Sequence, residues 1–350
     1  MPECKMFKHG VTINPAGSVR PCCMYDNIDM AWRYNEPGWR EEFDRLYEES
    51  LSDEWNPRCH ECKTEEEQNG WSLRKESNQI FDNTTQGTQY WDLKINNTCN
   101  LMCRMCSPNN SSTWKTQVKN SGHSDWDPFI LREMDLKTGW HKDILPEMKH
   151  NLYDTKVLKF TGGEPMLVAH VLDIIKWCVE EDIAPGIDLR MTTNCTVDPD
   201  PVWFDLFKHF KNIHISMSID AVGDRYNYVR AGGDWNITES NAIKFAQHRK
   251  QHHSMTCNLA FLPMSINAAN EQDARDWCEK HNIHFHRSPE CWRPEYLSYA
   301  SLDETLRTRY NVNSDTPFDP AQFERLKFQM SLIDKLYDTS FKEQCPEFFG

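Results

Sequence analysis

The chain has no long apolar run, no basic run, no internal repeat and no low-complexity tract, and these absences exclude several classes of protein. No segment offers the roughly 18 consecutive apolar residues of a transmembrane helix, and the amino terminus lacks the apolar h-region of a signal peptide. Lys and Arg number 39 against 53 Asp and Glu, a formal net charge of -14. Because nucleic-acid binding usually needs a basic face, this balance disfavours a nucleic-acid partner. We expect a cytoplasmic protein without a membrane partner.

Cysteine is the residue type that is abundant, with 14 copies in 350 residues. Without a route to an oxidising compartment, we interpret these cysteines as metal ligands and buried thiols rather than as disulfides. The buried thiols expected on this basis are Cys178, Cys195, Cys257, Cys278 and Cys345.

Three cysteines form a C-x3-C-x2-C loop, Cys99, Cys103 and Cys106. A closed [4Fe–4S] site takes four thiolates, so a loop with three leaves one iron able to bind a ligand through nitrogen and oxygen. The spacing alone also allows a three-thiolate zinc site or three unrelated thiols.

The middle of the chain, from about residue 87 to 300, alternates strand-like and helix-like stretches, which is typical of β/α units around a parallel sheet. Its strands alternate apolar and polar residues. In residues 211–220 one face carries Ile213, Ile215, Met217 and Ile219, and the other carries His214, Ser216, Ser218 and Asp220. With helices over the apolar faces, the polar faces line a common interior. We therefore predict an α/β fold built on a partial (β/α)6 TIM-like barrel; antiparallel strands with one face in water are the alternative.

The cysteine loop directly follows the predicted strand 90–96, at the carboxyl end where sites of this architecture lie. A second predicted strand, from residue 157, ends in Gly162-Gly163-Glu164-Pro165. Two glycines let the backbone approach a ligand closely, and the glutamate can accept a hydrogen bond from an ammonium group. Alone, this turn is also an ordinary strand-to-helix connection.

Together these motifs resemble the radical S-adenosylmethionine (SAM) superfamily. The matched features follow the family's order: the cysteine loop, the Gly-Gly-Glu-Pro turn, Thr192-Thr193-Asn194, the 216–220 segment and Arg230. The resemblance implies a [4Fe–4S] cluster on Cys99, Cys103 and Cys106 whose open iron binds SAM. It also implies reductive cleavage of SAM to a 5′-deoxyadenosyl radical that abstracts hydrogen from a substrate.

The resemblance also implies residues that bind SAM. Gly162, Gly163 and Glu164 would hold its methionine amino end, while Ser218 and Arg230 are candidates for its carboxylate and ribose. Asn194 can bind the ribose or simply form a turn. The family often has an aromatic residue before the last cysteine of the loop, and here that residue is Met105, whose thioether can pack on adenine.

A second cysteine group lies near the amino terminus, with a G-x4-C unit ending at Cys22 and a C-x2-C knuckle at residues 59–62. The spacing suits a zinc site or a fully ligated Fe–S cluster. The region resembles the SPASM or twitch modules of radical SAM enzymes, although those usually follow the barrel. The resemblance implies an auxiliary [4Fe–4S] cluster on Cys4, Cys22, Cys59 and Cys62, with Cys23 as a substitute ligand.

We therefore expect an auxiliary-cluster domain at residues 1–86, a radical SAM barrel at 87–300 and a C-terminal helical extension at 301–350. Candidate catalytic residues are Cys291, as a hydrogen-atom donor or cluster ligand, His284 and His286, which are placed on the interior face, and Asp220, as a general base. A buried-thiol role for Cys291 and structural roles for the histidines are the alternatives.

The expected substrate is a peptide or protein side chain, with a small polar metabolite (a sugar, amino acid or nucleoside) as the alternative. The expected electron donor is a flavodoxin or ferredoxin. A hypothesis from another class is a non-catalytic zinc protein that uses both cysteine groups as an interaction scaffold.

Overall fold

The computed structural model describes residues 3–25, 32–34, 36–52, 54–122, 124–137, 140, 146, 148–251 and 254–349. It divides into two compact units. Unit 1 comprises Met1–Asn97, Lys137–Met191 and Asp205–His214, and unit 2 comprises Thr98–Leu136, Thr192–Phe204 and Ile215–Gly350. This division is by compactness, and the predicted domain boundaries at residues 86 and 300 stay predictions.

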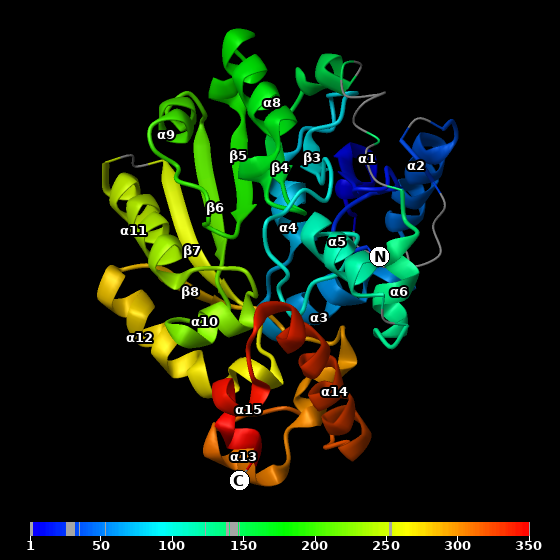
Figure 1. Cartoon of the computed structure of the whole chain (residues 1–350). Coiled ribbons are helices and arrows are strands. Elements are labelled where there is room, and N and C mark those ends of the chain that lie inside the picture. Colours follow the sequence, from blue (N-terminus) through cyan, green and yellow to red (C-terminus); the bar gives the residue numbers. More distant parts are fainter. Residues whose placement is uncertain are drawn as a thin grey trace. The chain divides into compact units, whose positions relative to one another are not determined.

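An eight-stranded, mostly parallel sheet has the order β2-β1-β3-β4-β5-β6-β7-β8 (Figure 1). The strands are β1 (Gly10–Ile13), β2 (Val19–Arg20), β3 (Tyr90–Leu93), β4 (Val157–Phe160), β5 (Asp188–Thr193), β6 (Asn212–Ser218), β7 (Met255–Phe261) and β8 (His284–Arg287). Strands β3 to β8 are the six strands of the predicted partial barrel, and the α/β fold class is confirmed. The N-terminal region adds β1, parallel to β3, and β2, antiparallel to β1.

The alternation predicted for β6 is present, because its buried and more exposed positions take turns along the strand. Ile213, Ile215 and Met217 are each no more than 2% exposed, since they form the apolar face of the strand. The intervening side chains form its polar face, as the sequence pattern predicts. Strand β3 is shorter than the predicted 90–96, although the Lys94 amide still donates to the Ile13 carbonyl at 2.9 Å.

The helices of unit 1 are α1 (Met6–His9), α2 (Trp39–Ser50), α3 (His60–Asn69), α4 (Leu73–Ile80) and α8 (Ala169–Glu180), with the short 3-10 helices η1 (Pro57–Cys59), η2 (His150–Leu152), η3 (Pro165–Leu167) and η4 (Ala184–Gly186). The helices of unit 2 are α5 (Ser112–Ser121), α6 (Pro128–Met134), α10 (Asp224–Val229), α11 (Trp235–Gln251), α12 (Glu271–His281), α13 (Glu304–Arg309), α14 (Pro320–Tyr337) and α15 (Phe341–Gln344), with η5 (Ser265–Asn270), η6 (Glu295–Leu297), η7 (Tyr299–Ser301) and η8 (Pro346–Phe349). Helix α9 (Val202–Phe207) crosses the boundary between the units.

The predicted C-terminal helix is α14. The Asp319 carboxylate caps its amino end by accepting from the Ala321 amide, and Pro320 occupies the first turn, where its missing N–H is not needed. The buried face includes Leu326, Met330 and Ile333. The helix therefore packs through one apolar stripe, as its sequence periodicity predicts.

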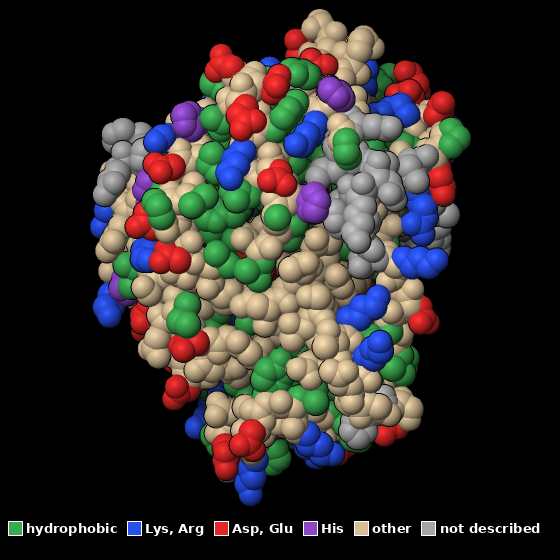
Figure 2. Space-filling view, turned by 45° about the horizontal axis from the view of Figure 1, so that its top comes forward, with side chains coloured by type: hydrophobic (Ala, Val, Ile, Leu, Met, Phe, Trp, Pro, Cys, Tyr) green, Lys and Arg blue, Asp and Glu red, His purple; other side chains and the backbone are tan. Residues whose placement is uncertain are grey.

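Charged side chains of both signs are interspersed on the face that Figure 2 shows, in keeping with the mixed composition. Among the described residues, no helix is long and apolar enough to cross a membrane.

Candidate active site

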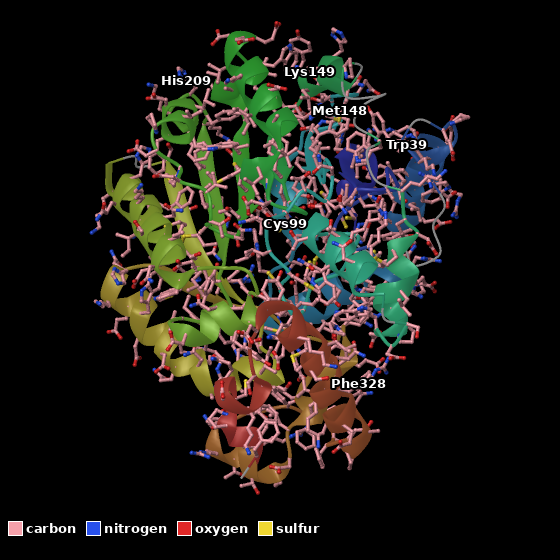
Figure 3. The ribbon with its side chains drawn as sticks, viewed as in Figure 1. Trp39, Cys99, Met148, Lys149, His209 and Phe328 are labelled. Carbon is pink, nitrogen blue, oxygen red and sulfur yellow. The ribbon has the colours of Figure 1, made fainter. Side chains whose placement is uncertain are left out.

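The cysteine loop lies after β3, at the start of unit 2, and Cys99 is labelled on it in Figure 3. The first turn of α5 holds the backbone of this loop. The Ser111 hydroxyl caps α5 by accepting from the Trp114 amide, and it donates to the Leu101 carbonyl at 2.6 Å. The Trp114 indole donates to the Cys103 carbonyl at 2.8 Å. The Ser-Ser-Thr-Trp sequence therefore starts a helix and fixes the cysteine loop with the same side chains.

The loop is also paired with the last residue of α10 and with the segment that follows it. The Met102 amide donates to the Ala231 carbonyl at 2.9 Å, and the Arg104 amide donates to the Val229 carbonyl at 3.0 Å. These ladder-like bonds fix the residues on both sides of Cys103. The three thiols therefore project from a backbone that is positioned before any cofactor binds.

Arg104 is fully buried inside unit 2. Its guanidinium donates to the Tyr228 carbonyl and to the Asp334 carboxylate, both at 2.7 Å, and to the Thr339 hydroxyl at 3.1 Å. It also stacks on the Tyr228 ring at 3.6 Å. Arg104 thus connects the cysteine loop to the carboxyl end of α14, a role that no local sequence pattern indicates.

The donor set of the loop fits an Fe–S cluster. Burial raises the pKa of the Cys103 thiol to about 12, with Arg230 lowering and Cys99 raising it. Burial also raises the pKa of Cys106 well above its usual range, and Cys103 and Cys99 raise it further. All three thiols belong to one eight-residue loop of unit 2. Thiols are soft ligands suited to iron, and a bound cation would relieve their repulsion as thiolates. Cys103 is buried, whereas Cys99 and Cys106 are half-buried.

Arg230 and Asp220 form a buried ion pair beside the loop. The remaining Arg230 donors reach the Ile219 carbonyl at 3.1 Å and the Cys103 sulfur at 3.6 Å. Asp220 also accepts from the Leu262 amide at 2.7 Å. Arg230 therefore contacts a predicted cluster ligand directly, and its role at the SAM carboxylate and ribose stays a prediction.

Asn194 lies at the carboxyl end of β5 and is buried. Its amide nitrogen approaches the Cys99 sulfur at 3.8 Å and donates to the Asn100 side chain at 3.1 Å. Its side-chain oxygen accepts from the Thr196 amide at 2.9 Å, which is a turn contact. Asn194 is thus both a turn former and a neighbour of the cysteine loop.

The Gly-Gly-Glu-Pro turn belongs to unit 1 and follows β4. Gly162 has φ +72° and Gly163 has φ +57°, a region that favours glycine. Glu164 is fully buried, and one carboxylate oxygen accepts from the Met166 amide at 3.1 Å, which caps η3. The two glycines therefore let the chain turn immediately after the strand, as the sequence predicts.

Replacement of Gly162 by alanine is expected to destabilise this turn. A Cβ atom there would lie 2.9 Å from the Lys94 Cβ and Cγ atoms, in addition to the unfavourable positive φ. Gly122 provides a matched control, since it has φ +65° and no atom within 4 Å of an added Cβ. We expect G162A to lower the free energy of unfolding by about 1–3 kcal/mol in denaturant titrations, and G122A by about 1 kcal/mol. Equal losses in the two variants would show that the contact with Lys94 is unimportant.

The predicted auxiliary ligands converge in unit 1. Cys4, Cys22, Cys59 and Cys62 line one pocket, together with apolar side chains and Arg74. Burial raises the pKa of Cys4 to about 12, and Cys59 and Cys62 raise it further. Among the described residues, no group of three or more His, Cys, Asp and Glu side chains is arranged as the ligands of a metal ion.

Cys23 has a different neighbour. The Lys159 ammonium on β4 approaches the Cys23 sulfur at 3.8 Å, and the same ammonium pairs with Asp92 at 3.1 Å. Cys23 is absent from the lining of the four-cysteine pocket. The adjacent residues Cys22 and Cys23 therefore have different surroundings, a distinction that spacing alone does not give.

The remaining candidates are separately placed in unit 2. Cys291 is buried, and its thiol donates to the Arg293 carbonyl at 3.3 Å. His284 and His286 are exposed on β8. Ser218 ends β6 and is half-buried, and Met105 is half-buried in the cysteine loop. The roles predicted for these side chains stay predictions.

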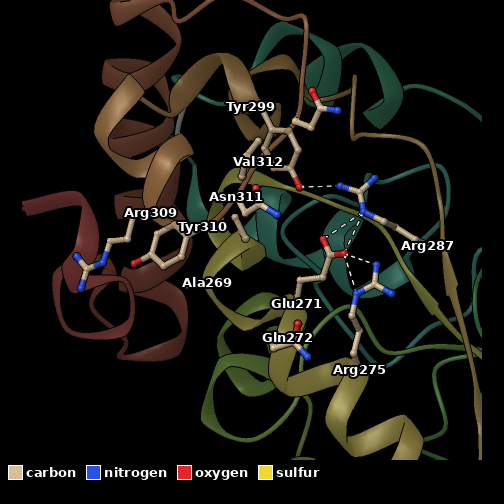
Figure 4. Close-up of a pocket in the computed structure, with 12 residues that line it drawn as sticks. Ala269, Glu271, Gln272, Arg275, Arg287, Tyr299, Arg309, Tyr310, Asn311 and Val312 are labelled. Carbon is tan, nitrogen blue, oxygen red and sulfur yellow. Dashed lines mark hydrogen bonds and ion pairs between the residues drawn. The ribbon is translucent and has the colours of Figure 1, made fainter.

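A further pocket of about 600 Å³ lies on unit 2, where α12 and β8 meet the segment around α13 (Figure 4). The Glu271 carboxylate accepts from Arg275 at 2.6 Å and from Arg287 at 3.1 Å. Arg287 also donates to the Tyr299 hydroxyl at 3.3 Å, and Arg309 lines the same pocket. The pocket is polar and basic, and it contains none of the predicted site residues.

The family model described as the Radical SAM superfamily matches residues 93–264, which include the cysteine loop and every SAM-binding candidate. No curated protein sequence matches the chain. Among solved structures, the chain is similar to anSMEcpe with bound AdoMet (14% identity, TM-score 0.39, covering 71% of this chain and 61% of that one). It is also similar to Streptococcus suis SuiB bound to precursor peptide SuiA (13% identity, TM-score 0.39, covering 91% and 56%). The chain thus spans less than two thirds of the length of these two proteins.

Proposed function

We propose that the chain is an enzyme that uses SAM and that Cys99, Cys103 and Cys106 hold its [4Fe–4S] cluster, because the Radical SAM superfamily model matches residues 93–264. The observation that supports this proposal is the C-x3-C-x2-C loop, whose backbone is fixed by hydrogen bonds on both sides of Cys103 and by the first turn of α5. When bound, the cluster supplies an electron for reductive cleavage of SAM to a 5′-deoxyadenosyl radical, which abstracts hydrogen from the substrate.

The residues of this chain position the cofactors. Arg230 and Asn194 each place a nitrogen near a predicted ligand sulfur. Hydrogen bonds to ligand sulfurs are among the factors that set the potential of Fe–S clusters. In this proposal Gly162, Gly163 and Glu164 hold the methionine amino end of SAM. Ser218 and Arg230 bind its carboxylate and ribose, Asn194 binds the ribose, and Met105 packs on adenine. A flavodoxin or ferredoxin supplies the electron.

The second part of the proposal is an auxiliary [4Fe–4S] cluster on Cys4, Cys22, Cys59 and Cys62. The support is that all four line one pocket. Four protein ligands leave no open iron, so this cluster would accept or relay an electron rather than bind SAM. The proposed substrate is a peptide or protein side chain, and a small polar metabolite is the second candidate because the strands carry polar interior faces.

Replacing Cys59 and Cys62 together by alanine is expected to remove the auxiliary cluster alone. Iron content should fall from about eight to about four atoms per chain, because one cluster of four irons is lost. Some SAM cleavage should remain. The control is Cys23→Ala, since Cys23 faces Lys159 and should leave the iron content unchanged. A loss of iron in the Cys23 variant and none in the double variant would contradict the ligand assignment.

The test of the proposed function is anaerobic reconstitution with iron and sulfide, followed by dithionite and SAM, with 5′-deoxyadenosine as the readout. We expect 5′-deoxyadenosine from the wild-type protein and none from the variant in which Cys99, Cys103 and Cys106 are all alanine. The alternative, a zinc-binding interaction scaffold, would be supported if the protein bound zinc at both cysteine groups, took up no iron and did not cleave SAM.

A further inference from the structure

One row of polar side chains crosses five strands of unit 1. In the sheet register, Arg20 on β2 is opposite Thr12 on β1, which lies beside Asp92 on β3. Asp92 lies beside Lys159 on β4, and Lys159 lies beside Arg190 on β5. Register partners in neighbouring strands point to the same face of a sheet. These five side chains therefore share the polar face.

A sixth polar side chain lies next to this row, on the same face of the sheet and just beyond the carboxyl end of β3. Lys94 is two residues beyond Asp92, so it points to the same face, and its amide extends the β1–β3 ladder. The alkyl chain of Lys94 packs over Gly162 in the turn after β4. The row thus reaches the carboxyl end of β3 and β4.

The row has more positive than negative charge. Asp92 pairs with Lys159 at 3.1 Å, and Glu76 on α4 pairs with Arg190. Lys94 and Arg20 have no hydrogen-bond or ion-pair partner for their side chains among the residues that the structure describes. Burial lowers the pKa of Lys94, and Arg20 and Lys159 lower it further against the opposing effect of Asp92. Within the described part of the chain, neither cation therefore forms an ion pair.

The row also contains an unsatisfied buried hydroxyl. Thr12 is fully buried, and its hydroxyl oxygen has no hydrogen-bond partner within the described part of the chain. Buried polar groups normally have partners, so an orphan within such a row indicates a missing one. The row is not closed off from solvent along its length, because Lys159 and Arg190 keep 23% and 22% of their side-chain surface exposed.

We propose that Arg20, Lys94 and Thr12 form a binding site for an oxyanion, a carboxylate or phosphate group, that belongs to the substrate of this enzyme. The guanidinium and ammonium groups supply charge-assisted hydrogen bonds, and the threonine hydroxyl supplies a further one. Lys159 and Arg190 are paired with Asp92 and Glu76, and they orient the other side chains of the row. The assignment of the anion to the substrate rests on the proposed function. The existence of an anion site is independent of that function.

The test uses the full reconstituted protein without SAM, in a chloride buffer, titrated with inorganic phosphate and separately with acetate by calorimetry. We expect binding by the wild-type protein that is weakened about 10-fold in Arg20→Gln and in Lys94→Met, since each removes a charged donor. Tighter binding of phosphate identifies a phosphate site, and tighter binding of acetate identifies a carboxylate site.

Two further variants make the result decisive. Thr12→Val preserves side-chain shape and should weaken anion binding about 3-fold without changing the melting temperature. This variant therefore tests the site even if Arg20→Gln or Lys94→Met misfolds. Arg309→Gln, in the surface pocket of Figure 4, should leave binding unchanged. Absence of binding by the wild-type protein, or a loss confined to Arg309→Gln, would overturn the site. Because no SAM is present, either result leaves 5′-deoxyadenosine formation as a separate measurement.

Discussion

Replacement of Cys103 by alanine is expected to reduce 5′-deoxyadenosine formation from SAM to below detection. Cys103 is the middle ligand of the loop, and its backbone is fixed on both sides by the bonds of Met102 and Arg104. Because this backbone is fixed, no other thiol can take the position of the Cys103 sulfur. The remaining two thiols cannot hold a four-iron cluster. Iron content should fall by about four atoms per chain, and the cluster absorbance should fall by half.

The matched control for this prediction is Cys257→Ala. Cys257 on β7 is a buried thiol of the same unit, 3% exposed, and no predicted cluster includes it. We expect this variant to keep its iron and its SAM cleavage. Continued 5′-deoxyadenosine formation by the Cys103 variant would remove the loop as the site of SAM chemistry, whereas equal losses in both variants would indicate general misfolding.

The sequence predicted the parts of this structure that depend on local pattern. The alternation in residues 211–220 is a period-2 signal, and it predicted both β6 and its buried face. The cysteine spacing and the Gly-Gly-Glu-Pro turn are contiguous motifs, and they indicated the family whose model matches residues 93–264. Strand β1 was not predicted, because it has only four residues and all of them are buried.

The parts that could not be predicted are contacts between distant residues. Arg104 meets Asp334 across 230 positions, and nothing in the local sequence around either residue marks them as partners. Arg230 is a second example. The motif predicts that an arginine lies at the site, but it does not show which atoms the guanidinium contacts. Its donors reach Asp220, Ile219 and Cys103. Side-chain partners follow from the packing of whole elements, which local pattern does not specify.

Replacement of Arg104 by methionine is expected to have the largest effect on stability. The side chain is 0% exposed, and its loss leaves the buried Asp334 carboxylate without its cation. Breaking a buried ion pair from one side costs about 3–5 kcal/mol, because the remaining charge is uncompensated. We expect a loss of that size in the free energy of unfolding, measured by denaturant titration. Iron content should also fall, because the Cys103–Cys106 segment loses its attachment to α14.

Two further variants test whether the loss of stability comes from the unpaired buried carboxylate rather than from the loss of any arginine. Arg45 on α2 forms exposed ion pairs with Glu42 and Glu49, so Arg45→Met should change the free energy of unfolding by less than about 1 kcal/mol. In the double variant Arg104→Met, Asp334→Leu, both charges are absent, and part of the stability should return because no buried charge is left unpaired. A double variant less stable than Arg104→Met would show that the cost comes from lost packing and hydrogen bonds. A partial recovery of both stability and iron would instead show that the buried charge is what couples α14 to the cysteine loop.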